Sequence, residues 1–232
     1  MFFTITDCRC WIRRAMLALA ASGFVILPAA AQTRPQKMLT VQDASGEFPG
    51  WKSFHEQPGT KTRDVWQLGP DGVLTCRGTP KGYLYTEKNY DNFVLRLEWR
   101  WPADKGPGKG GVLMRIVGED RIWPKSLEAQ INVGDAGDFW GLAGYPLSGP
   151  AERMKVVEHP QFGKLTNLKK TVALEKPAGQ WNQYEIAADG ETVVLRINGQ
   201  EVNRATGCTL LSGRICLTAE GNEIQFRNVE LK

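Results

Sequence analysis

The chain has 232 residues, of which 29 are Lys or Arg and 25 are Asp or Glu. Three of the basic residues and one of the acidic residues lie in the first 31, so the remainder carries a net charge of +2. Such an even balance does not favour nucleic acid as a partner, and about 200 residues fit a single domain.

The first 31 residues have the pattern of a signal peptide. Three arginines form a basic start, the apolar run AMLALAASGFVIL follows, and Ala29–Ala31 supply small residues for cleavage. The alternative is an uncleaved anchor, but the apolar run is shorter than the roughly 20 residues that a spanning helix needs. We therefore expect residues 1–31 to be removed, the mature protein to be periplasmic or secreted, and no membrane association to remain.

Residues 32–40 have no periodicity and are expected to form a flexible leader before one domain over residues 41–232. Short strands are indicated by DGVLTCRG and GYLYTE, which Gly and Pro bound, and by the clean alternation of FVLRLEWRW. In GGVLMRIVG, alternation places Val112, Met114 and Ile116 on one face and Leu113 and Arg115 on the other.

The stretch WPKSLEAQINVGDAGDFWG predicts a strand with one polar face, followed by a loop with further polar and aromatic residues. The apolar face consists of Leu127, Ala129, Ile131 and Val133, the polar face of Glu128, Gln130 and Asn132, and the loop contains Asp135, Asp138 and Trp140. The interval from Gly144 to about Leu168 lacks regular alternation and is long enough to be a functional loop over a sheet.

Four more strands are indicated near the C-terminus. WNQYEIAADGETVVLRINGQEVNRA contains two strand runs joined through Asp189-Gly190 and then a hairpin signal at Asn198-Gly199. GRICLTAEGNEIQFRNVELK supplies two strands more. Ten or more short strands with dense Gly and Pro predict an all-β fold, a two-sheet antiparallel sandwich or jelly roll.

Three cysteines remain after removal of the signal peptide. Cys76, Cys208 and Cys216 would lie in an oxidising compartment and allow at most one internal disulfide, whose pairing stays open. Their spacing does not resemble a zinc site, so no metal site is expected, and no cofactor is assigned.

The chain resembles the 3-keto-disaccharide hydrolase domain family. GYLYTEKNYDNFVLRLEWRW, GGVLMR, WPKSLEAQINVGDAGDFWG, WNQYEI, INGQEV and the last 20 residues occur in that family's order. The resemblance implies a concanavalin A-like lectin/glucanase sandwich whose concave sheet face binds carbohydrate. It also implies an exported protein that cleaves glycosides oxidised to a ketone at C3, with Arg115, Glu128 and Gln130 in the site. Many members have NSG where this chain has Lys109-Gly110, so no asparagine role transfers.

From alternation alone, Arg115, Glu128, Gln130 and Asn132 would be interpreted as the solvated face of a strand. The resemblance favours a ligand-binding role for Arg115, Glu128 and Gln130 instead, because the outer face of one sheet binds carbohydrate in this fold. Glucanases of this fold place carboxylates at alternate positions of one strand, and a retaining mechanism needs two about 5–5.5 Å apart. Here the next two polar residues of the strand, Gln130 and Asn132, are amides, so the strand has no second carboxylate to act as nucleophile.

A 3-keto sugar needs only one base to remove the acidic C2 proton, after which the C1 substituent leaves and water adds. We expect Glu128 to be that base and Arg115 to stabilise the enolate oxygen.

Several further residues are candidate contacts to a carbohydrate ligand. Gln130 is expected to donate to a sugar hydroxyl, and Trp123 and Trp140 to stack on a sugar ring. Asn132, Asp138, His159 and Glu220 are weaker candidates, because each has a common interpretation without a function. Asn132 could lie on a solvated strand face and Asp138 could cap a loop. His159 could be an exposed loop residue and Glu220 a solvated carboxylate at a strand end. Asp135 and Asp138 could also protonate the leaving group, bind a cation or only cap the loop. The alternative function is a non-catalytic carbohydrate-binding module that uses the same cleft.

Overall fold

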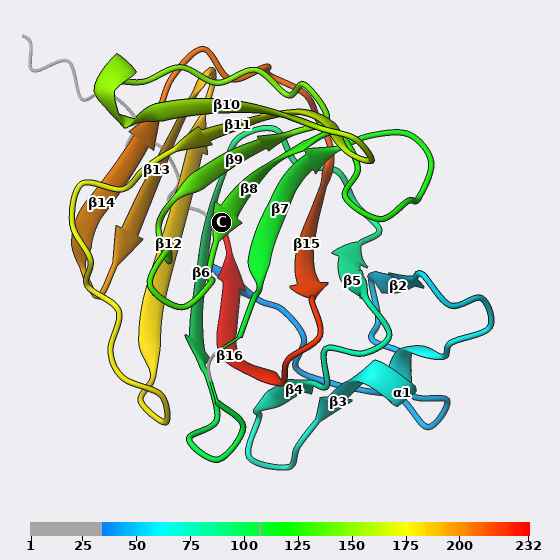
Figure 1. Cartoon of the computed structure of the whole chain (residues 1–232). Coiled ribbons are helices and arrows are strands. Elements are labelled where there is room, and N and C mark those ends of the chain that lie inside the picture. The colour runs from blue at the N-terminus through cyan, green and yellow to red at the C-terminus, as the bar shows by residue number, and fades with distance from the viewer. Residues whose placement is uncertain (1–33, 107) are drawn as a thin grey trace, which may run out of the picture. The chain divides into compact units, whose positions relative to one another are not determined.

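The computed structural model describes residues 34–106 and 108–232, so the expected signal peptide and its cleavage site lie outside the described residues. The described part forms two antiparallel sheets of eight strands each, packed face to face (Figure 1). Helical structure is limited there to the short α1 (Thr62–Val65) and the 3-10 turn η1 (Ala151–Arg153). No described helix is long and apolar enough to span a membrane.

We call the first sheet the back sheet. Its strands are, in order across it, β14 (Gln200–Ala205), β13 (Thr192–Ile197), β12 (Asn182–Asp189), β6 (Phe93–Arg100), β16 (Ile224–Leu231), β4 (Leu74–Cys76) and β3 (Trp66–Leu68), with β1 (Gln36–Lys37) paired to β16. Most neighbours are far apart in the sequence, which is typical of a jelly-roll sandwich.

We call the second sheet the site sheet, because the cleft described below lies on its outer face. Its strands are, in order, β10 (Met154–His159), β11 (Gly163–Leu168), β9 (Phe139–Leu142), β8 (Ser126–Gln130), β7 (Gly111–Ile116), β15 (Arg214–Ala219), β5 (Gly82–Thr86) and β2 (Trp51–His55).

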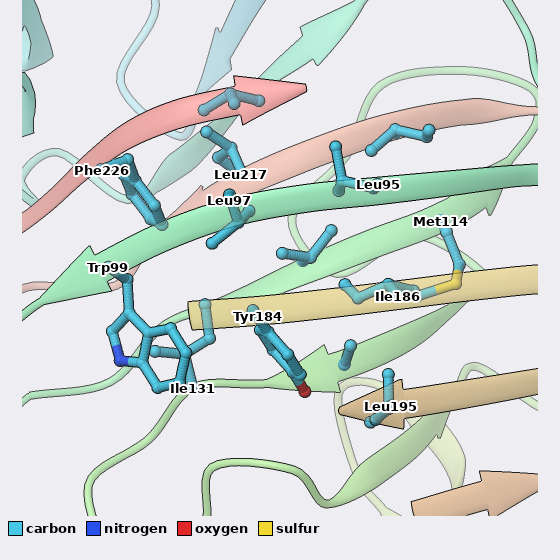
Figure 2. Close-up of a cluster of buried hydrophobic side chains, with 14 of the residues drawn as sticks. Leu95, Leu97, Trp99, Met114, Ile131, Tyr184, Ile186, Leu195, Leu217 and Phe226 are labelled. Atoms are coloured by element: carbon cyan, nitrogen blue, oxygen red, sulfur yellow. The ribbon is translucent and has the colours of Figure 1, made fainter. Parts of the chain in front are cut away.

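The hydrophobic core lies between the two sheets. It is formed by every second side chain of the strands, which point to the inner face of each sheet. In β6 the residues Leu95, Leu97 and Trp99 are at most 2% exposed, while their neighbours face the solvent. They pack with Met114 of β7 and Leu217 of β15 from the opposite sheet (Figure 2). Each such side chain contributes about 1.5–3 kcal/mol by leaving water, so the two sheets hold each other.

The predicted fold class is confirmed, and the hairpin between β13 and β14 turns at Asn198 and Gly199, which have φ of +51° and +85°. Two segments differ from expectation. Within the expected leader, Gln36–Lys37 pair with β16. The irregular interval 144–168 contains the hairpin β10–β11, whose alternation is weak because no residue of β10 is buried.

The three described cysteines, Cys76, Cys208 and Cys216, are buried and free. Cys76 lies on β4 and Cys216 on β15, so two of them belong to different sheets. No pair is formed among the described residues, and the expectation of at most one disulfide stays a prediction.

Candidate active site

A cleft of about 280 Å³ lies on the outer face of the site sheet. It collects side chains from β8, β9 and the β10–β11 hairpin, together with residues that flank β7 and β15. The lining residues are Lys109, Trp123, Glu128, Gln130, Asn132, Trp140, Leu142, His159, Phe162, Leu165 and Glu220. Seven of the nine residues expected in the site therefore lie around one cleft.

Glu128 lies in the middle of β8, where it pairs with Leu113 of β7 and Trp140 of β9. Only 8% of the residue is exposed. Its carboxyl group lies over Gly111, because a Cβ built there would be 2.5 Å from the Oε1 atom. Burial raises the pKa of Glu128 well above its ordinary value, and the charge of Glu220 raises it further.

Glu220 is the second carboxyl group of the cleft, and it comes from the chain that follows β15. The hydroxyl of Thr218 lies 2.8 Å from its Oε1 atom, and the Gly111 N–H donates to that same hydroxyl at 2.7 Å. Burial raises the pKa of Glu220, whereas the Thr218 hydrogen bond, Lys109 and Lys81 oppose the rise. Glu220 is thus a fixed, partly buried carboxyl group and not a solvated strand end.

Two further groups bring hydrogen-bond donors to the cleft. Lys109 supplies an ammonium group. His159 accepts hydrogen bonds at Nδ1 from the backbone N–H groups of Gln161 and Phe162, both at 3.2 Å. A nitrogen that accepts these bonds is unprotonated, so the neutral ring carries its proton on Nε2 and offers that N–H as a donor.

Aromatic residues form the walls of the cleft. Trp123 comes from the loop between β7 and β8 and has φ of +51°. Asp120 of the same loop accepts hydrogen bonds from the hydroxyls of Tyr83 and Tyr85 and from Arg214 at 2.6 Å. These contacts pin the loop onto β5 and β15, and so fix the position of Trp123.

Asn132 and Trp140 take their expected places beside Glu128. The Asn132 side-chain oxygen accepts a hydrogen bond from the Gly110 N–H at 2.9 Å, which ties the start of β7 to the chain after β8. The buried indole N–H of Trp140 has no hydrogen-bond partner among residues 34–106 and 108–232. Trp140 therefore contributes its ring to the wall of the cleft, and its N–H does not face the ligand space.

Arg115 does not reach the cleft, which corrects the expectation that it stabilises an enolate there. It is fully buried, and its guanidinium group donates to the backbone oxygens of Thr209, Gly190 and Asp91. The cause is a β-bulge. From Leu113 to Ile116 β7 has one residue more than β15, and Arg115 has φ of +58°. Strict alternation therefore fails at this position.

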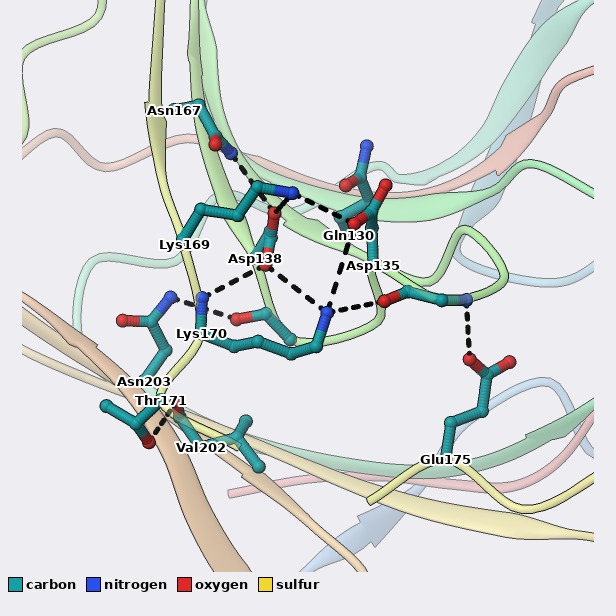
Figure 3. A network of polar contacts seen from close by, with 12 residues as sticks. Gln130, Asp135, Asp138, Asn167, Lys169, Lys170, Thr171, Glu175, Val202 and Asn203 are labelled. Atoms are coloured by element: carbon teal, nitrogen blue, oxygen red, sulfur yellow. Dashed lines mark hydrogen bonds and ion pairs between the residues drawn. The ribbon is translucent and has the colours of Figure 1, made fainter. Parts of the chain in front are cut away.

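Asp138 is also absent from the lining of the cleft, against expectation. Its carboxylate is 1% exposed and accepts hydrogen bonds from the Lys170 N–H at 3.0 Å and from Asn167 (Figure 3). The Lys169 and Lys170 ammonium groups lie 3.0 and 3.6 Å from it. Lys169 also pairs with Asp135. Both aspartates therefore serve to fix the loop before β9.

A second hollow, of about 390 Å³, lies on the back sheet. Its charges are paired with each other: Glu185 binds Arg96 at 2.7 Å and Arg196 at 2.9 Å. Paired charges on an open sheet face are typical of solvated surface. The smaller cleft is the better candidate, because its carboxyl groups have no such ion pairs. No cluster of potential metal ligands occurs among the described residues.

Sequence reasoning missed the apolar walls Leu142, Phe162 and Leu165, the position of Lys109, and the pairing of Glu220 with Glu128. Leu142 lies two residues after Trp140, so alternation could have placed it on the same face. The other contacts join strands far apart in the sequence, and no local pattern signals them.

Two antiparallel sheets with a polar cleft on one outer face define a concanavalin A-like β-sandwich. Residues 42–232 match the family described as 3-keto-alpha-glucoside-1,2-lyase-like domain, and the chain belongs to this family. Family membership supports a carbohydrate-related function and a hydrolase-like activity.

Solved structures of the same fold include enzymes and a binding module. A candidate glycosyl hydrolase from Parabacteroides distasonis is 20% identical with a TM-score of 0.55, and the match covers 80% of this chain and 89% of that one. The carbohydrate-binding module CBM66 from Bacillus subtilis is 13% identical with a TM-score of 0.53, over 78% and 93%. The Bacillus licheniformis β-glucanase is 12% identical with a TM-score of 0.53, over 84% and 95%. No curated protein matches the chain.

Proposed function

We propose that the protein cleaves 3-keto glycosides by removal of the C2 proton, elimination of the C1 substituent and addition of water. The observation that carries the proposal is a pair of partly or fully buried carboxyl groups, Glu128 and Glu220, in one cleft with aromatic walls. A binding site for a neutral sugar has no need of two buried, electrostatically coupled carboxyl groups, since each costs free energy to keep there.

With a ketone at C3 of the sugar, two carboxyl groups are enough to cleave the glycosidic bond. Removal of the C2 proton leaves an enolate, whose electrons expel the C1 oxygen, and the leaving oxygen needs one proton. One carboxyl group can therefore take the C2 proton while the other gives a proton to the leaving group. Lys109 and the Nε2–H of His159 are the donors that the cleft offers to the enolate oxygen in place of Arg115. The Gln130 amide supplies a donor for a sugar hydroxyl, and the ring of Trp140 supplies a stacking surface.

The test is a kinetic isotope effect at C2. A 3-keto glucoside deuterated at C2 should be cleaved more slowly than its normal counterpart, because the C2–H bond breaks during turnover. The matching glucoside without the ketone should be a poor substrate, because its C2–H is not acidic. Equal turnover of the oxidised and unoxidised glucosides would refute the proposal.

The second candidate function is a carbohydrate-binding module, which the CBM66 structure of the same fold favours. In that case the protein would bind a 3-keto glucoside in a calorimetric titration without releasing product. We further propose that the protein acts in the periplasm or outside the cell, on the basis of its N-terminal sequence pattern.

A further inference from the structure

The two carboxyl groups of the cleft have different surroundings, and this difference bears on which of them holds a proton. Glu128 is buried over Gly111, and no hydrogen bond from the described residues reaches its carboxyl group. Lys109 and Lys81 lower the pKa of Glu220, but they are not among the groups that shift the pKa of Glu128. An ionised carboxylate in such a place would lose much of its hydration with no hydrogen bond in exchange, whereas the protonated form loses less.

Glu220 has the opposite surroundings. The hydroxyl of Thr218 is placed to donate to it, and the field of Lys109 and Lys81 favours its charge. Close carboxyl groups of one cleft do not ionise together without cost. The state with a single proton therefore places that proton on Glu128 and leaves Glu220 as the carboxylate.

Thr218 can also serve Glu220 after it has been protonated. Its Oγ1 atom lies 2.8 Å from Oε1 of Glu220 and 3.2 Å from the Gly111 carbonyl oxygen. The hydroxyl can donate to the carboxylate while Glu220 is ionised and turn its hydrogen to Gly111 when Glu220 holds a proton. Both protonation states are then satisfied without movement of the backbone.

We propose that Glu220 is the base and Glu128 is the acid of the elimination, the reverse of the roles that the sequence alone indicates. The assignment rests on the proposed function. The Glu220 carboxylate takes the C2 proton, and the C–H electron pair forms the enolate. The C1–O bond then breaks, and its electron pair stays on the leaving oxygen, which takes the proton of Glu128. The products are the free alcohol and an enone with a C1=C2 bond.

Hydration reverses these roles and restores the starting state. The ionised Glu128 takes a proton from water, whose oxygen bonds to C1, while Glu220 returns its proton to C2. No oxidant or reductant is needed, since the substrate already carries the ketone. The product is the free 3-keto sugar.

The test compares two 3-keto glucosides that differ only in the leaving group, nitrophenol or methanol. The rate measured is release of the alcohol in a single turnover, before hydration, in which Glu128 has a second role. Nitrophenolate leaves without a proton, so Glu128→Gln should release it nearly as fast as wild type and lose about 10²-fold or more on the methyl compound. Glu220→Gln should lose at least about 10²-fold on both compounds. The control is Glu223→Gln, three residues along the chain and outside the cleft lining, which should change neither rate.

Proton exchange gives a second, independent signature. In D₂O, Glu128→Gln should introduce deuterium at C2 of the methyl compound faster than it cleaves it, because the base is intact and the leaving step is slow. Glu220→Gln should show only the exchange seen without enzyme. If a glutamine variant fails to fold, Glu128→Asp and Glu220→Asp keep the carboxyl group and should show the same pattern more weakly.

The outcomes separate the two proposals. Wild type that cleaves neither compound refutes the proposed function. Wild type that cleaves both, with the losses of the two variants exchanged or independent of the leaving group, overturns the assignment of Glu220 as base and Glu128 as acid.

Discussion

Gly111 lies under the Glu128 carboxyl group, so an added methyl group at this position would act on the cleft more than on the fold. In Gly111→Ala the new Cβ would lie 2.5 Å from Oε1 and 3.0 Å from Cγ of Glu128. Comfortable contacts between such atoms are about 3.5 Å, so the carboxyl group must move by roughly 1 Å. A misplacement of about 1 Å at a reacting group can cost 10²-fold in rate. We therefore expect kcat/KM on the methyl 3-keto glucoside, whose leaving group needs a proton from Glu128, to fall by about 10²-fold.

The stability of Gly111→Ala should change little. Gly111 does not have a positive φ, and alanine at an ordinary backbone conformation reduces the entropy of the unfolded chain by about 0.4–1 kcal/mol. Gly110→Ala is the matched control, because its nearest neighbours are Ile224 and Trp101 at 3.4 and 3.5 Å. The assay is kcat/KM together with thermal unfolding. Equal activity of the two variants would refute the argument that Glu128 must occupy its present position.

Four further predictions concern the rest of the chain. Arg115→Ala should lower the free energy of unfolding in urea by roughly 3–5 kcal/mol, because buried carbonyl oxygens lose a charged donor; wild-type stability would contradict this. Lys109→Met should raise the pKa of Glu220, so the acid limb of the kcat/KM profile should move to higher pH, and a shift to lower pH would be inconsistent with the cleft electrostatics. Thiol titration of the denatured, unreduced protein should find three thiols, and one thiol would mean a disulfide. Protein exported by an expression host should begin near Gln32, and mature protein that still begins at Met1 would rule out cleavage.

The fold was predictable because the strands of a sandwich keep strict alternation wherever one face is buried. FVLRLEWRW and WNQYEIAAD show that alternation, and both form central strands of the back sheet. The hairpin β10–β11 was not predictable, because β10 is an edge strand without a buried face and the first half of β11 is also exposed or half-buried, so alternation carries no signal there.

The site was predictable only where alternation holds. Glu128 and Gln130 face the cleft as their positions in β8 require. Arg115 does not, because a single extra residue in β7 reverses every face that follows it. Asp138 lies two positions before Trp140, so alternation predicts the same face for both. Its carboxylate instead forms ion pairs with two lysines that lie more than 30 positions further along the chain. Such long-range charge pairing has no local signature in a single sequence.

The position of β16 in the back sheet has a consequence for how the domain is made. This last strand does not lie at an edge but between β6 and β4, and β1 also pairs with it (Figure 1). A ribosome-bound chain that lacks β16 therefore has two unpaired strand edges in the middle of one sheet, and the core lacks Ile224, Phe226 and Val229 of β16. Folding of this sheet has to wait until β16 has been synthesised, and deletion of Ile224–Leu231 should leave a chain prone to edge-to-edge aggregation.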